Sequence, residues 1–430
     1  MRVAHKTVEY LPLLCEHECV PLPEGRLGNA LMTRICSDDY NPADAGALLG
    51  LDWGNRSRTC VQAGYFVGMK WVEHGVSAVC VNPKIDRLDV LGMFMKCLDN
   101  PLPEVRAALA GIYQVDFDSQ MIPAEGCRVE LTPFVIAHFL LLLEAIVKKG
   151  LRRNYVEIED SLQGRIKGKV CVSTTVKRHH GAGRPDRVHC RYHEFSADCI
   201  ENRVLNTALE FCERYLACHR DMSGSERLDE KARYCRGAFG GIGYVDPLLP
   251  VPRVSLNPFY VDYSEAMRVA TWIFRRFAFD FGNTVSDLGH LVPPFHIDMP
   301  LLYELYVLSL LREAYGENVS YHISTYGNEL DFLKKDEKLI IDTKYKVKWA
   351  TATHHDDVRQ LSGYARNRRL RERILAPEEA GKAIIDCMVI YPSANGIDDF
   401  KGAHSLLAVA EPVAEYERFY RLGLRLPVLK

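Results

Sequence analysis

The sequence lacks the features that mark secretion, membrane insertion and structural zinc binding. Its 14 cysteines are scattered through 430 residues without any C-x-x-C pair, and residues 1–10 lack the apolar core of a signal peptide. The longest apolar run, Phe134 to Val147, includes His138 and Glu144 and is shorter than the roughly 20 residues of a membrane span. We therefore expect a cytoplasmic protein with reduced thiols and no transmembrane segment.

Two further absences limit the function. The net charge is -2, so a nucleic-acid-binding surface would have to come from local basic clusters rather than from the whole surface. No G-x-x-x-x-G-K-[ST] segment occurs, so the chain is not expected to bind a nucleoside triphosphate by itself. The rest of the composition is that of an ordinary globular protein, and the length favours two or three domains.

The apolar pattern predicts a mixed α/β protein with a β-rich N-terminal domain. Residues 1–150 are predicted to form short strands and turns and then a helix over residues 131–149. Residues 151–430 form the second predicted domain, in which residues 223–258 are expected to be loops and residues 295–410 the core. The expected elements of this core are a helix, three strands, a helix and two strands, at residues 300–315, 319–324, 329–333, 339–347, 356–373, 383–391 and 405–409.

The most informative segment runs from Asn328 to Trp349 and is predicted to form a β-hairpin. Side chains alternate between the faces of a strand, so Asp342 and Lys344 point the same way, and Asp331 on the partner strand lies beside Asp342. Two carboxylates can hold a hard divalent cation, and a lysine adds positive charge beside it, as metal-dependent phosphodiester hydrolysis requires. The alternative is a solvent-facing hairpin with an ordinary Asp–Lys pair, because D-x-K tripeptides are common.

Residues on the neighbouring helices extend this candidate site. Gln360 and Tyr364 are four positions apart and therefore share one face of the predicted helix. Glu304 lies among apolar neighbours in the preceding helix, either as a site residue or as a partly buried carboxylate. Arg366 and Arg369 belong to an arginine-rich stretch that follows Tyr364, and they are candidates for contact with DNA phosphates. A solvated helix end is the alternative.

A second basic segment covers residues 177–193 and is predicted to be a polar loop. Lys177 and Arg178 begin this segment and are further candidates for contact with DNA phosphates. A solvated loop explains the same composition equally well, so the role of the segment stays open.

Together these residues resemble the PD-(D/E)xK nuclease superfamily and, more closely, the McrC family, the nuclease subunit of the McrBC modification-dependent restriction system. The matching residues are Glu304, Asp331, Asp342 and Lys344 in IIDTKYK, and Gln360 and Tyr364 in DDVRQLSGYA. The segments LQGRIKGKV, YHEFSADCIENRVLNTAL and, more weakly, YFVGMKW…VNPKI are also similar to this family. Leu330 stands where the superfamily motif usually has proline, which is not a metal ligand.

The resemblance implies a fold, a cofactor and partners. The fold would be a restriction-endonuclease-like core after the β-rich N-terminal domain. Asp331 and Asp342 would hold Mg²⁺, or Mn²⁺ in its place, and the other four matching residues would complete the catalytic site. The implied partners are DNA, with modified cytosine sites chosen by another chain, and a McrB-like AAA+ GTPase that contacts residues 1–150. GTP would then be used only through that partner chain.

Two other functions stay open from the sequence. The Q-x-x-x-Y element at Gln360 also resembles RecB-type nucleases, so a repair exonuclease that works without a GTPase ring is one alternative. The other is a non-catalytic scaffold that activates a GTPase and carries an inactive nuclease fold. The intact set of Asp331, Asp342 and Lys344 argues against the scaffold.

Overall fold

The structure of the protein is a computed structural model. It describes residues 8–11, 14–37, 41–42, 48–98, 108, 111–117, 119–124, 126–247, 261–282, 291–325, 328–375 and 384–429, without the side chains of 261, 275–282, 325, 328 and 329. The elements combine several sheets with helices, so the predicted mixed α/β class is confirmed.

The chain forms two compact units, and the first is built from two separate stretches of sequence. Unit 1 contains Met1–Glu130 and Leu288–Lys430, and unit 2 contains Leu131–Asp287. The sequence predicts one division near residue 150, whereas these units separate before the helix over residues 131–149. That helix packs against three other helices of unit 2, which is why it groups with them.

The N-terminal stretch of unit 1 contributes most of two sheets. The larger sheet has the order β1-β7-β6-β14-β8, with β2 also paired to β7, and the smaller has the order β3-β5-β4. The strands of the two sheets are β1 (Glu9–Tyr10), β2 (Leu14–Cys15), β3 (Cys19–Pro21), β4 (Asp52–Trp53), β5 (Cys60–Gln62), β6 (Phe66–Glu73), β7 (Ser77–Asn82), β8 (Tyr113–Val115) and β14 (Phe295–Asp298). Helices α1 (Arg26–Ile35) and α2 (Val90–Cys97) accompany them, and β9 (Ile122–Pro123) pairs with β13 (Leu291–Val292).

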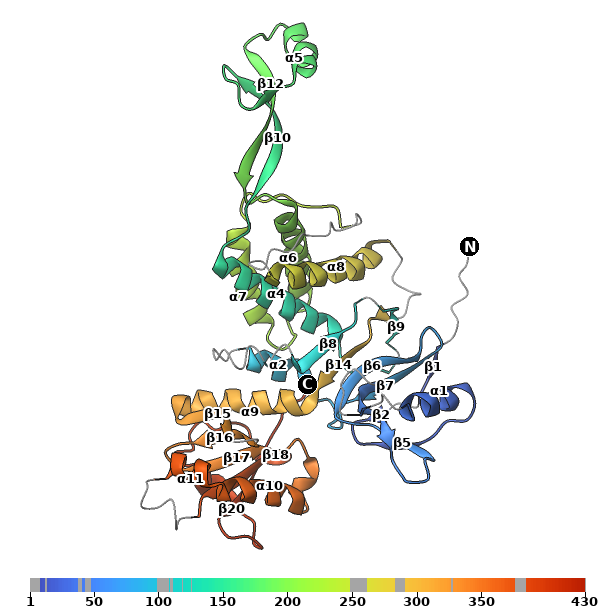
Figure 1. Cartoon of the computed structure of the whole chain (residues 1–430), viewed down its shortest axis with the longest axis vertical. Helices are drawn as coiled ribbons and strands as arrows, with labels where there is room; N and C mark the ends of the chain where they lie inside the picture. Colours follow the sequence, from blue (N-terminus) through green and yellow to red (C-terminus); the bar gives the residue numbers. More distant parts are fainter. Residues whose placement is uncertain are drawn as a thin grey trace. The chain divides into compact units, whose positions relative to one another are not determined.

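The C-terminal stretch of unit 1 forms a second six-stranded sheet, in the order β15-β16-β17-β18-β20-β19. Its strands are β15 (Val319–Thr325), β16 (Asn328–Lys334), β17 (Leu339–Thr343), β18 (Asp386–Ile397), β19 (Glu411–Pro412) and β20 (Phe419–Leu424). Its helices are α9 (Met299–Tyr315), α10 (His355–Arg366), α11 (Arg368–Ile374) and α12 (Leu406–Val409). In Figure 1, α9 runs along one side of this sheet and α10 lies on the other.

Local sequence explains how this core begins and where the prediction fails. The side chain of Asp298 accepts a hydrogen bond from the Leu301 amide and caps α9, with Pro300 in the first turn. The predicted strand at residues 405–409 is wrong, because residues 406–409 form α12. A short apolar run does not distinguish a strand from one helical turn. The last strand in the sequence is β20, which the sequence analysis did not predict.

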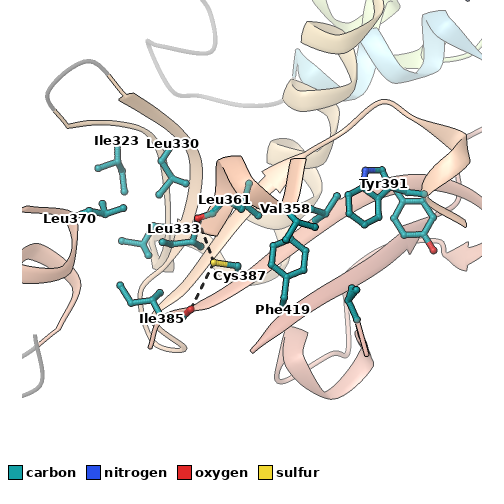
Figure 2. Packing of buried hydrophobic residues seen from close by; sticks show 14 of the residues in the cluster. Ile323, Leu330, Leu333, Val358, Leu361, Leu370, Ile385, Cys387, Tyr391 and Phe419 are labelled. Atoms are coloured by element: carbon teal, nitrogen blue, oxygen red, sulfur yellow. Dashed lines mark hydrogen bonds between the residues drawn. The ribbon is translucent and has the colours of Figure 1, made fainter. Parts of the chain in front are cut away.

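A single apolar cluster joins α10 and α11 to the strands beneath them. It contains Val358 and Leu361 of α10, Cys387 of β18 and Phe419 of β20, which Figure 2 shows packed side by side. The Cys387 thiol also donates to the Leu361 carbonyl at 3.8 Å. The helix that carries Gln360 is therefore fixed to the sheet by its buried face.

Unit 2 combines helices with a long hairpin. Its helices are α4 (Leu131–Lys149), α5 (Val172–Arg178), α6 (Ile200–Cys218), α7 (Ser225–Ala238) and α8 (Val261–Gly282). Strands β10 (Asn154–Gln163) and β12 (Arg187–Ser196) pair antiparallel along their full length, with β11 (Lys169–Val170) added to β12. Within unit 2 this hairpin projects away from the helices and carries α5 at its far end (Figure 1).

Two predictions for unit 2 are corrected by these elements. Residues 177–193 are not a loop throughout, because Lys177 and Arg178 end α5 and residues 187–193 belong to β12. Residues 223–258 include the helix α7, although the sequence analysis expected only loops there. Among the described residues, α4 is long and apolar enough to cross a membrane by length and composition alone, and ten of its residues are buried.

The apolar cluster beneath α10 predicts a large loss of stability when it is opened. Replacing Leu361, which is fully buried, with alanine should lower the free energy of unfolding by about 3 kcal/mol, because a cavity replaces the lost contacts. Urea unfolding followed by circular dichroism measures this change. Leu291→Ala removes the same atoms from a side chain that is 38% exposed and is the matched control. Equal losses in the two variants would contradict the assignment of Leu361 to the core.

Candidate active site

The hairpin of β16 and β17 brings two carboxylates to the same place. The strands pair antiparallel with Phe332 opposite Ile341, and the same register sets Asp331 opposite Asp342. Oδ2 of Asp331 accepts hydrogen bonds from the backbone amide of Thr343 at 2.8 Å and from its hydroxyl at 3.0 Å. The carboxylate of Asp331 therefore takes the place of a backbone acceptor and is held in a single orientation.

A chain of polar contacts leads from Asp342 to α10. Nζ of Lys344 lies 2.8 Å from Oδ2 of Asp342 and donates to Oε1 of Gln360 at 3.2 Å. The amide of Gln360 in turn donates to the Tyr364 hydroxyl at 2.9 Å. The structure thus brings together Asp342, Lys344, Gln360 and Tyr364, which sequence analysis had placed on two separate elements.

Glu304 lies near the same carboxylates and belongs to α9. It contacts His322, a residue that the sequence analysis did not single out. Nε2 of His322 lies 2.8 Å from Oε1 of Glu304. His322 belongs to β15, where the register puts it opposite Asp331, and its φ of 47° interrupts the regular pairing between Tyr321 and Ile323. A left-handed backbone at a residue other than glycine is strained and is concentrated at functional sites. The sequence holds no local signal for this conformation.

Burial and mutual repulsion destabilise the negative charges of the site. The pKa of Asp331 is raised to about 6, mainly by burial and next by the nearby negative charge of Glu304. The pKa of Asp342 is raised to about 7, mainly by burial and next by the negative charge of Asp331. The positive charge of Lys344 opposes this shift. Burial also disfavours the charge on Lys344, but Asp342 outweighs this effect and raises the pKa of the lysine. Two repelling carboxylates of this kind are stabilised as anions when a cation binds between them.

The donor set fits magnesium better than a metal that requires a complete protein cage. Among the described residues, no group of three or more His, Cys, Asp or Glu side chains is arranged to hold a metal ion. Mg²⁺ is commonly held by one or two carboxylates, with water and phosphate oxygens completing its shell. Asp331 and Asp342 supply those two carboxylates, and Oδ2 of Asp342 is buried beside the Lys344 ammonium.

The predicted DNA-contacting residues lie on exposed surfaces of both units. Arg366 ends α10 and Arg369 lies in α11, so both belong to the unit that contains the carboxylates. Lys177 and Arg178 belong to unit 2, at the end of α5. A polar cavity of about 400 Å³ also adjoins His322, and its lining includes Arg312 and Arg373 but no carboxylate. Cationic cavities of this composition suit a phosphate group.

Comparison with known proteins adds a family match to this geometry. The model of a family described as "McrBC 5-methylcytosine restriction system component" matches residues 61–375, which is more than half of the chain. A comparison with curated proteins finds no significant match.

Two solved structures from Thermococcus gammatolerans are similar at 16% sequence identity. One is a half-complex of McrB AAA+ hexamers with bound McrC; it covers 96% of this chain and 94% of the matched chain, with a TM-score of 0.39. The other is the McrBC complex; it covers 70% of this chain and 86% of the matched chain, with a TM-score of 0.29. Scores this low add nothing to the family match.

The raised pKa of Asp331 predicts a stability gain when its charge is removed in the absence of metal. The folded protein binds this proton more tightly than the unfolded chain, so the destabilisation grows as the pH rises from about 4 to about 6 and is complete above that. Asp331→Asn should therefore raise the free energy of unfolding at pH 8 in EDTA by about 1 kcal/mol or more, and by less at pH 5.

Urea unfolding at the two pH values measures this difference. Asp398→Asn, at an exposed carboxylate paired with Arg425, is the control and should change little at either pH. A gain for Asp331→Asn that is the same at pH 5 and pH 8 would contradict the electrostatic origin assigned to it.

Proposed function

The chain belongs to the McrBC 5-methylcytosine restriction system component family, and we propose that it is the Mg²⁺-dependent DNA endonuclease subunit of a modification-dependent restriction complex. The observation that carries this proposal is the convergence of Asp331, Asp342 and Lys344 at the end of one hairpin, with Gln360 bonded to the lysine. We assign this arrangement to a PD-(D/E)xK catalytic core.

Each residue has a distinct part in the proposed reaction. Asp331 and Asp342 would hold the metal, which supplies a Lewis acid and lowers the pKa of bound water. Thr343 orients Asp331 through two hydrogen bonds. Lys344 stabilises negative charge that develops on the phosphate or orients the attacking water. Gln360 holds the Lys344 ammonium on the side of the site that faces α10.

Glu304 and Tyr364 complete the proposed site at its edges. Glu304 adds a third carboxylate, oriented by His322, and would accept a hydrogen bond from water in the site. Tyr364 fixes the amide of Gln360 by accepting its hydrogen bond, so the acceptor oxygen of Gln360 stays directed at Lys344. Mn²⁺ is the expected substitute for Mg²⁺, because both ions accept oxygen ligands.

The family membership also supports proposed partners. We expect a McrB-like AAA+ GTPase to supply GTP hydrolysis and the choice of modified cytosine sites, with residues 1–150 as the proposed contact. The exposed cations Arg366, Arg369, Lys177 and Arg178 are the proposed contacts to DNA phosphates. A cytoplasmic location agrees with DNA as the substrate.

Removal of the central residues tests the catalytic assignment. Asp342→Ala should abolish Mg²⁺-dependent cleavage, and Lys344→Ala should slow it by about 100-fold or more, because charge developing in the transition state loses its stabilisation. Gel assays with methylated plasmid DNA measure cleavage, while thermal unfolding and co-purification with the GTPase verify folding and assembly. Asp398→Ala and Lys335→Ala are the controls at surface positions outside the site. Wild-type cleavage rates in the Asp342 and Lys344 variants would overturn the assignment.

The choice of substrate separates the proposed endonuclease from an exonuclease or a scaffold. An endonuclease needs no DNA end, so covalently closed circular DNA should be nicked or linearised in Mg²⁺. An exonuclease of the RecB type would degrade linear DNA and leave the closed circle intact. A scaffold would leave both substrates intact but still stimulate GTP hydrolysis by the partner.

A further inference from the structure

The residue that follows Lys344 is held by two side chains from the N-terminal part of the chain. Nζ of Lys84 donates to the backbone carbonyl of Tyr345 at 2.6 Å, and the Tyr345 hydroxyl donates to Oε2 of Glu16 at 3.2 Å. The backbone amide of Lys84 donates to the same Glu16 oxygen at 3.1 Å. Glu16 and Lys84 precede Tyr345 by 329 and 261 residues, yet all three belong to unit 1.

The aromatic ring of Tyr345 has two close partners. The Lys84 ammonium lies 3.5 Å from the centre of the ring, which is a cation–π contact. The ring of Tyr303 lies 5.6 Å away, in a tilted arrangement, and Tyr303 precedes Glu304 directly in α9. Tyr345 is 3% exposed and Glu16 is 3% exposed, so this contact is part of the interior.

The charges of Glu16 and Lys84 attract each other, although the hydrogen bond between the two residues comes from the Lys84 backbone amide. Burial raises the pKa of Glu16 to about 7, although Lys84 opposes the shift. Burial lowers the pKa of Lys84 to about 8, against the attraction of Glu16. Removal of either partner alone would leave an uncompensated buried charge, which is strongly destabilising in proteins. Apolar side chains of similar volume would fill this space without the cost of desolvating two charges. The contact with Tyr345 gives the two charged residues a specific role.

The backbone around Lys344 shows what this contact fixes. The amide of Lys344 donates to the carbonyl of Ile390 at 3.0 Å, and the amide of Lys346 donates to the carbonyl of Lys344 at 2.7 Å. Lys346 is in turn paired with Asp357 of α10 at 2.8 Å. The bond from Lys84 to the Tyr345 carbonyl fixes the peptide that lies between these anchors. The Cα atom of Lys344 is thus held from β18, from α10 and from the N-terminal part of the chain.

We propose that Glu16, Lys84 and Tyr345 are positioning residues that hold the turn at residues 344–346, so that the N-terminal part of the chain completes the active site. This inference rests on the proposed nuclease function. The three residues do not touch the reacting atoms, and they act through the placement of Lys344. Their loss lowers the rate of cleavage at saturating DNA and leaves DNA affinity unchanged, because the buried Glu16 and Tyr345 present no surface to DNA.

Two substitutions in the full chain test the proposal. Tyr345→Phe keeps the ring and removes the bond to Glu16, whereas Lys84→Met keeps the length and removes the bond to the carbonyl. Each should reduce the single-turnover rate constant in Mg²⁺ by about 10-fold or more, because small misplacements of a catalytic group have large effects. The DNA dissociation constant, measured by fluorescence anisotropy in Ca²⁺, should stay within about twofold of the wild-type value, well below a tenfold change.

Tyr10→Phe is the matched control, since it removes a tyrosine hydrogen bond from β1 to Pro123 of β9 without touching the turn at residues 344–346. This variant should cut at the wild-type rate. Variants of Tyr345 and Lys84 that also cut at the wild-type rate would overturn the proposal, as would a loss of rate that weaker DNA binding fully explains. If Lys84→Met does not fold, the double variant Glu16→Gln/Lys84→Met removes both buried charges and carries the same expectations.

Failure of the proposed function would be visible separately. If the wild-type chain cuts no DNA with its partner and any divalent metal, the nuclease function is wrong. Hydrogen exchange of the Lys344 and Lys346 amides then decides the positioning role. Loss of their protection in Lys84→Met, with protection kept in Tyr10→Phe, supports it. Unchanged protection in both variants overturns it.

Discussion

Strand β17 places a carboxylate at the end of a completely buried apolar segment. The surrounding residues must stabilise a negative charge in an apolar interior. Leu339, Ile340 and Ile341 are fully buried between β16 and the parallel strand β18, and Asp342 follows them at 1% exposure. Hydrophobic burial fixes the strand, while the desolvated charge requires a compensating partner. Lys344 supplies one positive charge, and the proposed metal supplies the rest. The same burial that makes the site costly in stability also prevents water from screening its charges.

Much of the fold follows from local sequence because its patterns are short-range. The helix at residues 131–149 is α4 with the same bounds, and the hairpin of Asp331 and Asp342 follows from strand alternation and a four-residue turn. Gln360 and Tyr364 share a helix face because of their spacing, and the structure adds the hydrogen bond between them. Prediction failed where the apolar pattern was ambiguous, since residues 406–409 form α12 rather than part of a strand.

The remaining features depend on contacts that no local pattern encodes. His322 contacts Glu304 from a backbone in the left-handed conformation, and the segment SYHIST contains no residue that predicts this conformation. Glu16 and Lys84 resemble ordinary surface charges in the sequence, yet the fold carries them to Tyr345 across most of the chain. The division of the chain after Glu130 was also hidden, because the helix that follows is equally compatible with either neighbour until its packing partners are known.

Unit 2 is inserted between two strands of unit 1 that pair with each other. Strand β9 precedes unit 2 and β13 follows it, and the two strands pair with each other inside unit 1, with Ile122 opposite Val292. The chain therefore leaves unit 1 and returns to it at neighbouring points of one small ladder. An insertion closed in this way can lengthen, shorten or be exchanged without a change in the register of the sheets that it interrupts. Selection can thus remodel the β10–β12 hairpin and its helices as a replaceable module while the strands that carry Asp331 and Asp342 stay unaltered.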